Sequence, residues 1–156
     1  MSTTVIKPRR SLIFVPGNKP EWFPKALKHG ADIVCVDIED AIAPSQKNSA
    51  REKTLALFDQ DNDIATPECI VRINNLRSVD GLRDVIAILE RTRPPPALML
   101  TKVKSRDEVC QLDELLSMPP HDAIRFHVII ETNDGLEAAY EIARSSKRID
   151  SLLFGG

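Results

Sequence analysis

Residues 33–40 read Ile-Val-Cys-Val-Asp-Ile-Glu-Asp, an apolar run that ends in acidic residues. Further runs of this kind lie at residues 11–15, 69–73, 97–103, 126–130 and 151–154. Runs that are apolar at nearly every position, instead of at every second one, are typical of parallel strands covered on both faces. We therefore interpret these runs as six strands of a parallel sheet.

The segments between the runs have the spacing of amphipathic helices. Apolar side chains recur three and four positions apart in residues 82–89, 109–116 and 136–143. Ser45 is a start signal for a helix over residues 46–58, and Ser105 with Glu108 three positions later has the pattern of a capping box. The chain thus predicts five strand–helix units followed by a sixth strand.

Strict alternation of strand and helix implies either a doubly wound sheet or a barrel. A doubly wound sheet suits a chain of 156 residues better, but it usually has a Gly-rich phosphate loop after its first strand. Residues 15–20 read Val-Pro-Gly-Asn-Lys-Pro, which is not such a loop. A (β/α)8 barrel usually needs about 250 residues, and this chain stops near its sixth strand. The alternation alone leaves both architectures open.

Composition argues against two classes of partner. The formal net charge is −2, and the basic residues are spread along the chain instead of forming a block. Aromatic residues make up only 4% of the chain, which leaves few stacking platforms for bases. No apolar run approaches the length of a membrane span. Residues 1–9 lack the apolar stretch of a secretory signal, and we expect a short flexible lead-in there.

The cysteines and His127 have ordinary structural interpretations. Cys35, Cys69 and Cys110 do not have metal-ligand spacing, and the first two lie inside apolar runs, where a thiol behaves as a small hydrophobic group. This usage is consistent with a reducing compartment, and we expect a cytoplasmic protein. His127 lies on the fifth strand, where a hydrogen-bonded core histidine is the favoured interpretation.

Charge interrupts four consecutive apolar runs near the same end. The second strand ends in Asp37 or Glu39, and Arg72, Lys102 and Glu131 follow on the next three strands. The carboxyl ends of barrel strands carry the active site, and charge on a buried strand is costly unless it is paired or binds something. One such residue could be a structural ion pair, but four of mixed sign indicate a functional site. Acidic groups beside Arg and Lys suit a small anionic substrate held on a divalent cation.

Several motifs in order resemble the HpcH/HpaI aldolase and citrate lyase beta-subunit family. Residues 10–18, Arg-Ser-Leu-Ile-Phe-Val-Pro-Gly-Asn, resemble its opening motif. The family's second-strand signature is resembled by residues 37–41, Asp-Ile-Glu-Asp-Ala, followed by Ala43-Pro44, Lys47, Ala50 and Arg51. Its later strand ends are matched by residues 71–74, 102–103, 130–132 and 154–156. The resemblance implies a TIM-type (β/α)8 barrel over residues 10–156, here truncated after about the sixth strand.

The resemblance also implies a reaction and a metal. The family cleaves or forms carbon–carbon bonds, and its citrate lyase-like branch acts on thioesters such as citryl-, malyl- or citramalyl-CoA, releasing an oxo-acid and acetyl-CoA. Glu131 resembles the first Mg²⁺-binding carboxylate, and the second is expected beyond the end of this chain. Arg72 resembles the arginine that holds the substrate carboxylate, and Glu39 and Asp40 resemble acidic residues near the metal.

Further expectations follow from the same resemblance. Arg10 and Lys19 correspond to the CoA side of the substrate, and Lys102 is a further substrate-binding candidate. The family leads us to expect a homo-oligomer.

Two other hypotheses remain open. Lys102 could act as a Schiff-base nucleophile, as in some barrel aldolases, which predicts trapping by borohydride and indifference to chelators. A lysine among acids stays protonated, however, and this disfavours that chemistry. The chain could instead be a truncated, non-catalytic homologue that binds CoA thioesters or regulates a partner.

Overall fold

The computed structural model describes residues 8–59 and 67–155. Within these residues six parallel strands form one sheet in the order β1-β2-β3-β4-β5-β6, with bounds Leu12–Pro16, Ile33–Asp37, Glu68–Arg72, Ala97–Leu100, Arg125–Ile130 and Ile149–Phe154. A doubly wound sheet reverses its strand order at a switch point. Here each strand pairs with the next along the chain, as in a TIM-type barrel. The predicted fold class is therefore confirmed.

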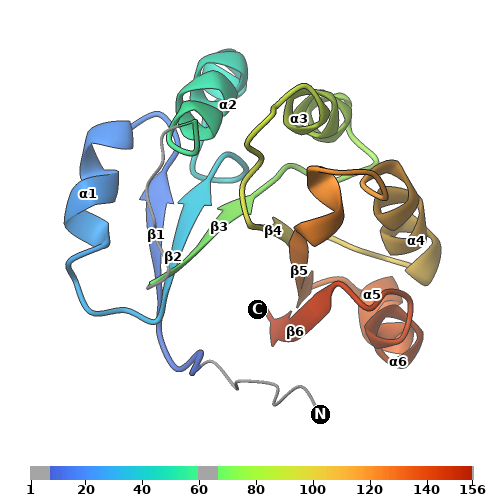
Figure 1. Cartoon of the computed structure of the whole chain (residues 1–156). Helices are drawn as coiled ribbons and strands as arrows, with labels where there is room; N and C mark the ends of the chain where they lie inside the picture. The colour runs from blue at the N-terminus through green and yellow to red at the C-terminus, as the bar shows by residue number, and fades with distance from the viewer. Residues whose placement is uncertain (1–7, 60–66, 156) are drawn as a thin grey trace, which may run out of the picture.

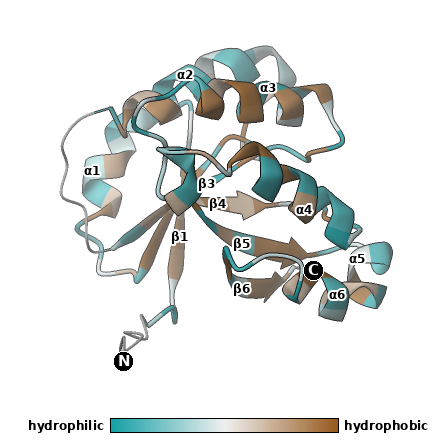
Figure 2. Ribbon diagram, turned by 45° about the vertical axis from the view of Figure 1, so that its right-hand side comes forward, coloured by the Kyte–Doolittle hydropathy of each residue, from teal (hydrophilic) through white to brown (hydrophobic). Residues whose placement is uncertain are grey.

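The helices lie outside the sheet and form an arc around it (Figure 1). Among the described residues the α-helices are α1 to α6, with bounds Phe23–Ala26, Lys47–Ala56, Val79–Leu89, Arg106–Leu115, Asn133–Glu137 and Ala139–Ala143. The 3-10 helices η1 to η3 span Pro20–Trp22, Pro44–Gln46 and His121–Ala123. Figure 2 shows mainly hydrophobic strands, whereas the helices carry hydrophilic residues as well. The strands are thus the inner layer, and the helices separate that layer from water.

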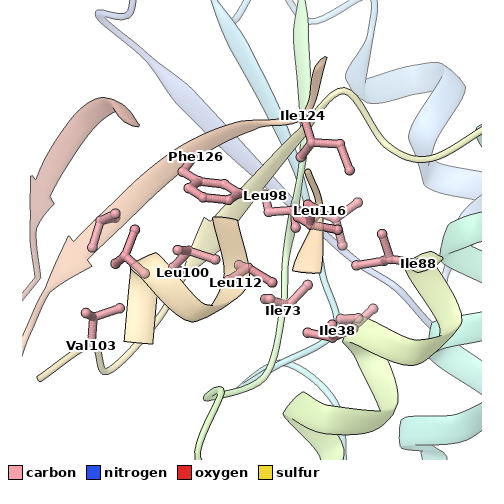
Figure 3. Packing of buried hydrophobic residues seen from close by; sticks show 14 of the residues in the cluster. Ile38, Ile73, Ile88, Leu98, Leu100, Val103, Leu112, Leu116, Ile124 and Phe126 are labelled. Atoms are coloured by element: carbon pink, nitrogen blue, oxygen red, sulfur yellow. The ribbon is translucent and has the colours of Figure 1, made fainter. Parts of the chain in front are cut away.

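The main core lies between the sheet and the helices. Figure 3 shows Ile73, Leu98 and Phe126 from the strand side packed with Ile88 of α3 and Leu112 of α4. All of these side chains are buried. Burying a side chain of this size contributes about 1.5–3 kcal/mol, so this layer is a main source of stability for the fold.

The opposite face of the sheet is also apolar. A separate cluster of buried residues includes Cys35, Ile70, Met99 and Ile129. Cys35 and Cys69 are buried free thiols, and burial raises the pKa of Cys69 to about 11. Their predicted role as small hydrophobic residues is confirmed, because a buried thiol with a raised pKa is unreactive.

Two predicted helix starts differ from the structure. Ser45 lies in η2, and α2 begins after Gln46, whose side chain does not cap the described helix. Ser105 is the N-cap of α4, but in the described residues its side chain makes no capping hydrogen bond. Glu108 instead accepts the backbone N–H of Lys104 at 3.1 Å. Ser45 is therefore not a cap. Neither bond of the predicted capping box is formed among these residues, because Glu108 accepts from the residue before the N-cap and not from Ser105.

Most of the predicted lead-in over residues 1–9 lies outside the described residues, which begin at Pro8. Across the described part of the chain, no helix has the length and apolar character that crossing a membrane requires.

Candidate active site at the carboxyl ends of the strands

Strand register brings charged residues of neighbouring strands together. Asp37, the last residue of β2, aligns with Pro16 of β1 and with Arg72 of β3. Lys102 and Glu131 follow the ends of β4 and β5, which also pair in parallel. Parallel strands all end at one edge of a sheet, so these side chains belong to one site.

Arg72 is held by Asp37 in a two-pronged ion pair. Its Nε and Nη2 donate to the two carboxylate oxygens of Asp37 at 2.9 and 2.5 Å. The guanidinium also lies over the Phe14 ring, 4.9 Å from the ring centre. Burial alone would lower the pKa of Arg72, but the hydrogen bonds and charge of Asp37 raise it well above its usual value. Arg72 is thus a permanently charged group in a fixed orientation.

Asp37 is a site residue whose role the sequence did not reveal. It is 1% exposed. Besides Arg72, it accepts the backbone N–H of Glu39 at 2.8 Å and that of Ala41 at 3.1 Å. Its position as the final residue of a buried strand was the signal that it faces a site.

Lys102 connects two parts of the site. Its Nζ contacts the carboxylates of Glu39 and Asp40, the latter at 3.0 Å. Its backbone N–H donates to Glu131 Oε1 at 2.9 Å. Lys102 has a φ of 54°, and among the described residues it is the one non-glycine residue with a positive φ. In this left-handed conformation the backbone N–H can donate to Glu131 while the side chain contacts Glu39 and Asp40.

These contacts shift three pKa values. The hydrogen bond with Glu39 raises the pKa of Lys102. Burial raises the pKa of Glu39, and the hydrogen bond from Lys102 only partly offsets that shift. Burial would also raise the pKa of Asp40, but its hydrogen bonds with Lys102 and Glu39 outweigh burial and lower it. Lys102 therefore remains an ammonium ion at neutral pH.

Glu131 lies between a strand end and a capped helix. Thr132 is the N-cap of α5: its hydroxyl accepts the N–H of Gly135 at 2.9 Å and donates to the carbonyl of Val103 at 3.2 Å. Gly155, just after β6, passes beside Glu131. A Cβ at Gly155 would lie 3.5 Å from Glu131 Oε2 and 3.1 Å from a methyl group of Ile129. The glycine therefore lies in ordinary contact distance of an exposed carboxylate, and the tight approach there is to Ile129.

Lys47 and Arg51, which belong to the second-strand signature, lie on helix α2 and hold the loop and helices next to the site. Lys47 of α2 donates to the backbone carbonyls of Ile38 and Glu39 and to the side chain of Asn74. Lys47 therefore fixes the loop that carries Glu39. Deeper in the structure, Arg51 of α2 donates to Asp84 of α3 at 2.6 Å, and both side chains are buried.

The structure does not bring the two predicted CoA-side residues together. Lys19 is exposed in the loop after β1, at the same edge as the acidic residues. Arg10 precedes β1 at the opposite edge, where it pairs with both carboxylate oxygens of Asp32. Arg10 and Lys19 flank the first strand, so they lie at its opposite ends.

A second charged cluster lies at the amino ends of the strands. Among the described residues, one group of His, Cys, Asp or Glu brings three ligand atoms within 4.8 Å of one another, and it consists of Glu68, His127 and Asp150. Arg9 donates to both carboxylates, and Arg125 donates to Asp150. Two arginines therefore balance the two acids without any added cation.

His127 fits the predicted core role. It is fully buried, its Nδ1 lies 2.7 Å from Ser151 Oγ, and its Nε2 lies 3.3 Å from Glu68 Oε1. Burial lowers its pKa, although the charge of Glu68 opposes the shift. The prediction of a hydrogen-bonded core histidine is confirmed.

The order of motifs and the fold agree with a known family. The model of the HpcH/HpaI aldolase/citrate lyase family matches residues 10–156. The chain belongs to this family. The L-malyl-CoA/beta-methylmalyl-CoA lyase of Cereibacter sphaeroides is 31% identical over 155 residues, covering 96% of this chain and 48% of that protein. The mitochondrial citramalyl-CoA lyase of Rattus norvegicus is 30% identical over 165 residues, with 96% and 48% covered.

Solved structures show the same fold. RipC from Yersinia pestis has a TM-score of 0.74 and 31% identity, covering 94% of this chain and 57% of that one. The citrate lyase beta subunit of Mycobacterium tuberculosis, solved with oxaloacetate and magnesium, has a TM-score of 0.71 and 30% identity, covering 94% and 59%. The chain spans about half the length of the curated relatives it matches. Its named relatives place it in a family of CoA-ester carbon–carbon lyases.

Proposed function

We propose that this chain carries the arginine and acidic part of a Mg²⁺-dependent carbon–carbon lyase site. The substrate is a 3-hydroxy-3-carboxy-acyl-CoA thioester such as citryl-, malyl- or citramalyl-CoA, and the products are an oxo-acid and acetyl-CoA. The observation that carries the proposal is the fixed Arg72 beside the acidic loop and the Lys102–Glu131 contact. The malyl-CoA and citramalyl-CoA lyases among the relatives support the substrate class.

Arg72 is suited to hold the substrate carboxylate. A guanidinium can bind two carboxylates, because it has N–H donors on two edges. Asp37 takes the edge made by Nε and Nη2. Among the described residues no hydrogen bond is formed to Nη1, so the second edge remains for a ligand. We assign that edge to the carboxylate that leaves with the oxo-acid.

The acidic residues fit a magnesium ion. Carboxylate oxygens are the hard ligands that Mg²⁺ prefers, and Glu131 presents an exposed carboxylate at the carboxyl end of β5. We assign Glu131 as a metal ligand, and Glu39 and Asp40 as groups near its waters. When bound, Mg²⁺ supplies Lewis-acid stabilisation of the developing oxyanion. The complex of the Mycobacterium tuberculosis relative with oxaloacetate and magnesium supports this assignment.

The proposed cleavage is a retro-aldol or retro-Claisen reaction. The substrate 3-hydroxyl loses its proton, the bond between C2 and C3 breaks, and C3 becomes the carbonyl carbon of the oxo-acid. The electron pair moves to the thioester as an enolate, which takes up a proton to give acetyl-CoA. Arg72 keeps the oxo-acid carboxylate in place throughout, so its contribution is to orient the bond that breaks.

The pKa of Lys102 argues against the Schiff-base hypothesis. An amine must lose its proton before it can attack a carbonyl. Contact with Glu39 and Asp40 raises the pKa of Lys102, so less of the neutral amine is present at pH 7. We therefore assign Lys102 to positioning and substrate binding.

The proposal is tested by measuring acetyl-CoA release from the three thioesters and oxaloacetate binding by calorimetry, each with Mg²⁺ and with EDTA. We expect oxaloacetate binding that depends on Mg²⁺. Arg72→Met should weaken binding about 10- to 100-fold, since hydrogen bonds to charged groups contribute about 1.5–3 kcal/mol. Glu131→Ala should remove the response to Mg²⁺.

Glu114→Ala is the matched control, because Glu114 is an exposed carboxylate on the outer helix α4. It should leave binding and release unchanged. Oxaloacetate binding without acetyl-CoA release would favour the non-catalytic homologue. Binding that persists in EDTA and in Arg72→Met would contradict the proposed site.

A further inference from the structure

Both carboxylate oxygens of Asp37 accept hydrogen bonds from other residues of the protein. Oδ1 accepts from Arg72 Nε and from the Glu39 backbone, and Oδ2 accepts from Arg72 Nη2 and from the Ala41 backbone. A carboxylate offers about four lone-pair sites. With these contacts made, and with the side chain buried, Asp37 does not have an acceptor left for a substrate or a metal ion.

Each oxygen of Asp37 therefore joins the arginine to the acidic loop. The arginine belongs to β3, whereas Glu39 and Ala41 belong to the segment after β2. Lys47 binds the carbonyl of Glu39 from the helix side, so the loop is held from two directions. A rotation of the Asp37 carboxylate would move the guanidinium and the Glu39 backbone together.

We infer that Asp37 is a positioning residue that fixes the ligand-binding edge of Arg72 and the acidic loop at the same time. The inference rests on the proposed function, because it names what orients the arginine of that site. Phe14 covers one face of the guanidinium and restricts its plane. Asp37 binds the Nε edge of Arg72, and Phe14 lies against one face of the guanidinium. The remaining edge is therefore already oriented before a ligand binds. Such pre-organisation lowers the entropy lost when a ligand binds.

A purely structural ion pair would behave differently. Removing one partner of a buried pair destabilises a protein whatever its function. A structural role therefore predicts a loss of stability with the affinity of the folded fraction unchanged. A positioning role predicts a loss of affinity in folded protein, and this loss requires Arg72.

The test is a double-mutant cycle on oxaloacetate affinity, measured by calorimetry with Mg²⁺ on protein shown to be folded by circular dichroism. Asp37→Asn keeps the shape but places an N–H₂ group against N–H donors. We expect it to weaken binding about 10-fold or more. In the Arg72→Met background, Asp37→Asn should cause little further loss, because it acts through the arginine.

Asp113→Asn is the matched control. Asp113 of α4 also accepts a hydrogen bond from a buried arginine, Arg148. Arg148 immediately precedes β6, so this pair lies away from the carboxyl ends of the strands. This variant should retain wild-type affinity. If Arg72→Met loses binding while folded Asp37→Asn keeps it, Asp37 is only structural. A full additional loss in the Arg72→Met background would equally overturn the inference. Absence of binding by the unmodified chain would instead overturn the proposed function and the inference with it.

A second measurement does not depend on the folding of any Asp37 variant. The Arg72 Nε–H signal in an NMR spectrum of the unmodified chain can be assigned by its disappearance in Arg72→Met. We expect this proton to exchange slowly with water, and to stay slow when oxaloacetate is added, because Asp37 retains it. Fast exchange in either state would overturn the inference.

Discussion

Lys102 has a backbone conformation that its residue type does not favour. A left-handed residue with a Cβ costs about 1–2 kcal/mol, and strain of this kind persists where the surrounding structure holds it. Here the contacts to Glu131, Glu39 and Asp40 all depend on that conformation. The same residue explains why the fourth strand ends at Leu100, whereas its apolar run predicted a strand over residues 97–103.

Two substitutions separate the backbone of Lys102 from its charge. Lys102→Gly removes the ammonium and relieves the left-handed backbone, whereas Lys102→Met removes the ammonium alone. We expect Lys102→Gly to be more stable than Lys102→Met by about 0.5–1 kcal/mol. Relief of the left-handed backbone stabilises the folded state, and the greater freedom of glycine in the unfolded chain offsets part of that gain. Urea unfolding at pH 7 measures the difference. Equal stability of the two variants would show that the backbone is not strained.

Single residues also show which parts of the site a sequence can reveal. The gathering of Arg72, Lys102 and Glu131 at one end of the sheet was predictable. Strands and helices alternate regularly along the sequence, and parallel strands all end on the same side of the sheet. The fork between Asp37 and Arg72 was not, because it depends on the register of two strands and on side-chain rotamers. Arg10 was predicted on the CoA side from its motif, but it lies at the other edge of the sheet, paired with Asp32. The roles assigned to the site residues remain predictions.

At the scale of elements, α5 is the helix that fixes Glu131. Its cap, Thr132, satisfies the orphan N–H of Gly135 and also binds a carbonyl of the preceding loop. Gly135 is required there, since a Cβ would lie 2.3 Å from the carbonyl oxygen of Val103. The cap thus connects the end of β5 with the segment after β4.

Removing this cap should cost stability in a defined way. Thr132→Ala loses both hydrogen bonds, and we expect a loss of about 1 kcal/mol, the usual value for an N-cap. Thr132→Ser keeps the hydroxyl and should lose much less. Thermal unfolding of the two variants compares them. A serine variant as unstable as the alanine variant would mean that the methyl group, not the hydroxyl, is what matters.

The helices also show where periodicity misleads. Residues 82–89 have helical spacing, yet Leu82 and Ile86 of α3 are more than half exposed, while Val85 and Ile88 are buried. The buried face of α3, which also includes Gly81 and Ala87, therefore only partly coincides with the apolar spacing of residues 82–89. Residues 136–143 form two short helices instead of one, because the backbone leaves helical geometry at Ala138. Neither effect is encoded in hydrophobic spacing.

At the scale of the whole molecule, the two edges of the sheet have different charge networks. The carboxyl edge groups acids around Lys102 and Arg72, and the amino edge groups Glu68 and Asp150 around Arg9 and Arg125. The amino-edge network joins β3, β5, β6 and the segment before β1. Its compensated charges indicate a structural role. The expected homo-oligomer and cytoplasmic location remain predictions.

Acid should weaken the fold through His127. Its folded pKa lies below the unfolded value of about 6.5. The unfolded chain therefore takes up a proton at a higher pH than the folded chain, and stability falls as the pH drops below about 6.5 until the folded pKa is reached. One such group contributes at most about 1.4 kcal/mol per pH unit. Urea unfolding from pH 7.5 to 5 measures the slope.

His127→Gln is the comparison for this prediction, because glutamine keeps a hydrogen-bonding group near Ser151 but does not titrate. The variant should be less stable at pH 7.5 and should show a shallower decline between pH 7.5 and 5. An identical decline in both proteins would place the pH dependence elsewhere.

The bond from Arg9 to Asp150 has a consequence for how the chain folds during synthesis. The two residues are 141 positions apart, so at about 5–20 residues per second a ribosome needs roughly 7–30 s between making one and making the other. During that interval β1 to β5 can pair, but the amino edge cannot close. Contacts of such long separation form slowly even in a finished chain. A nascent chain of this protein therefore presents an incomplete sheet, without its amino-end ion pairs, until Asp150 has been made.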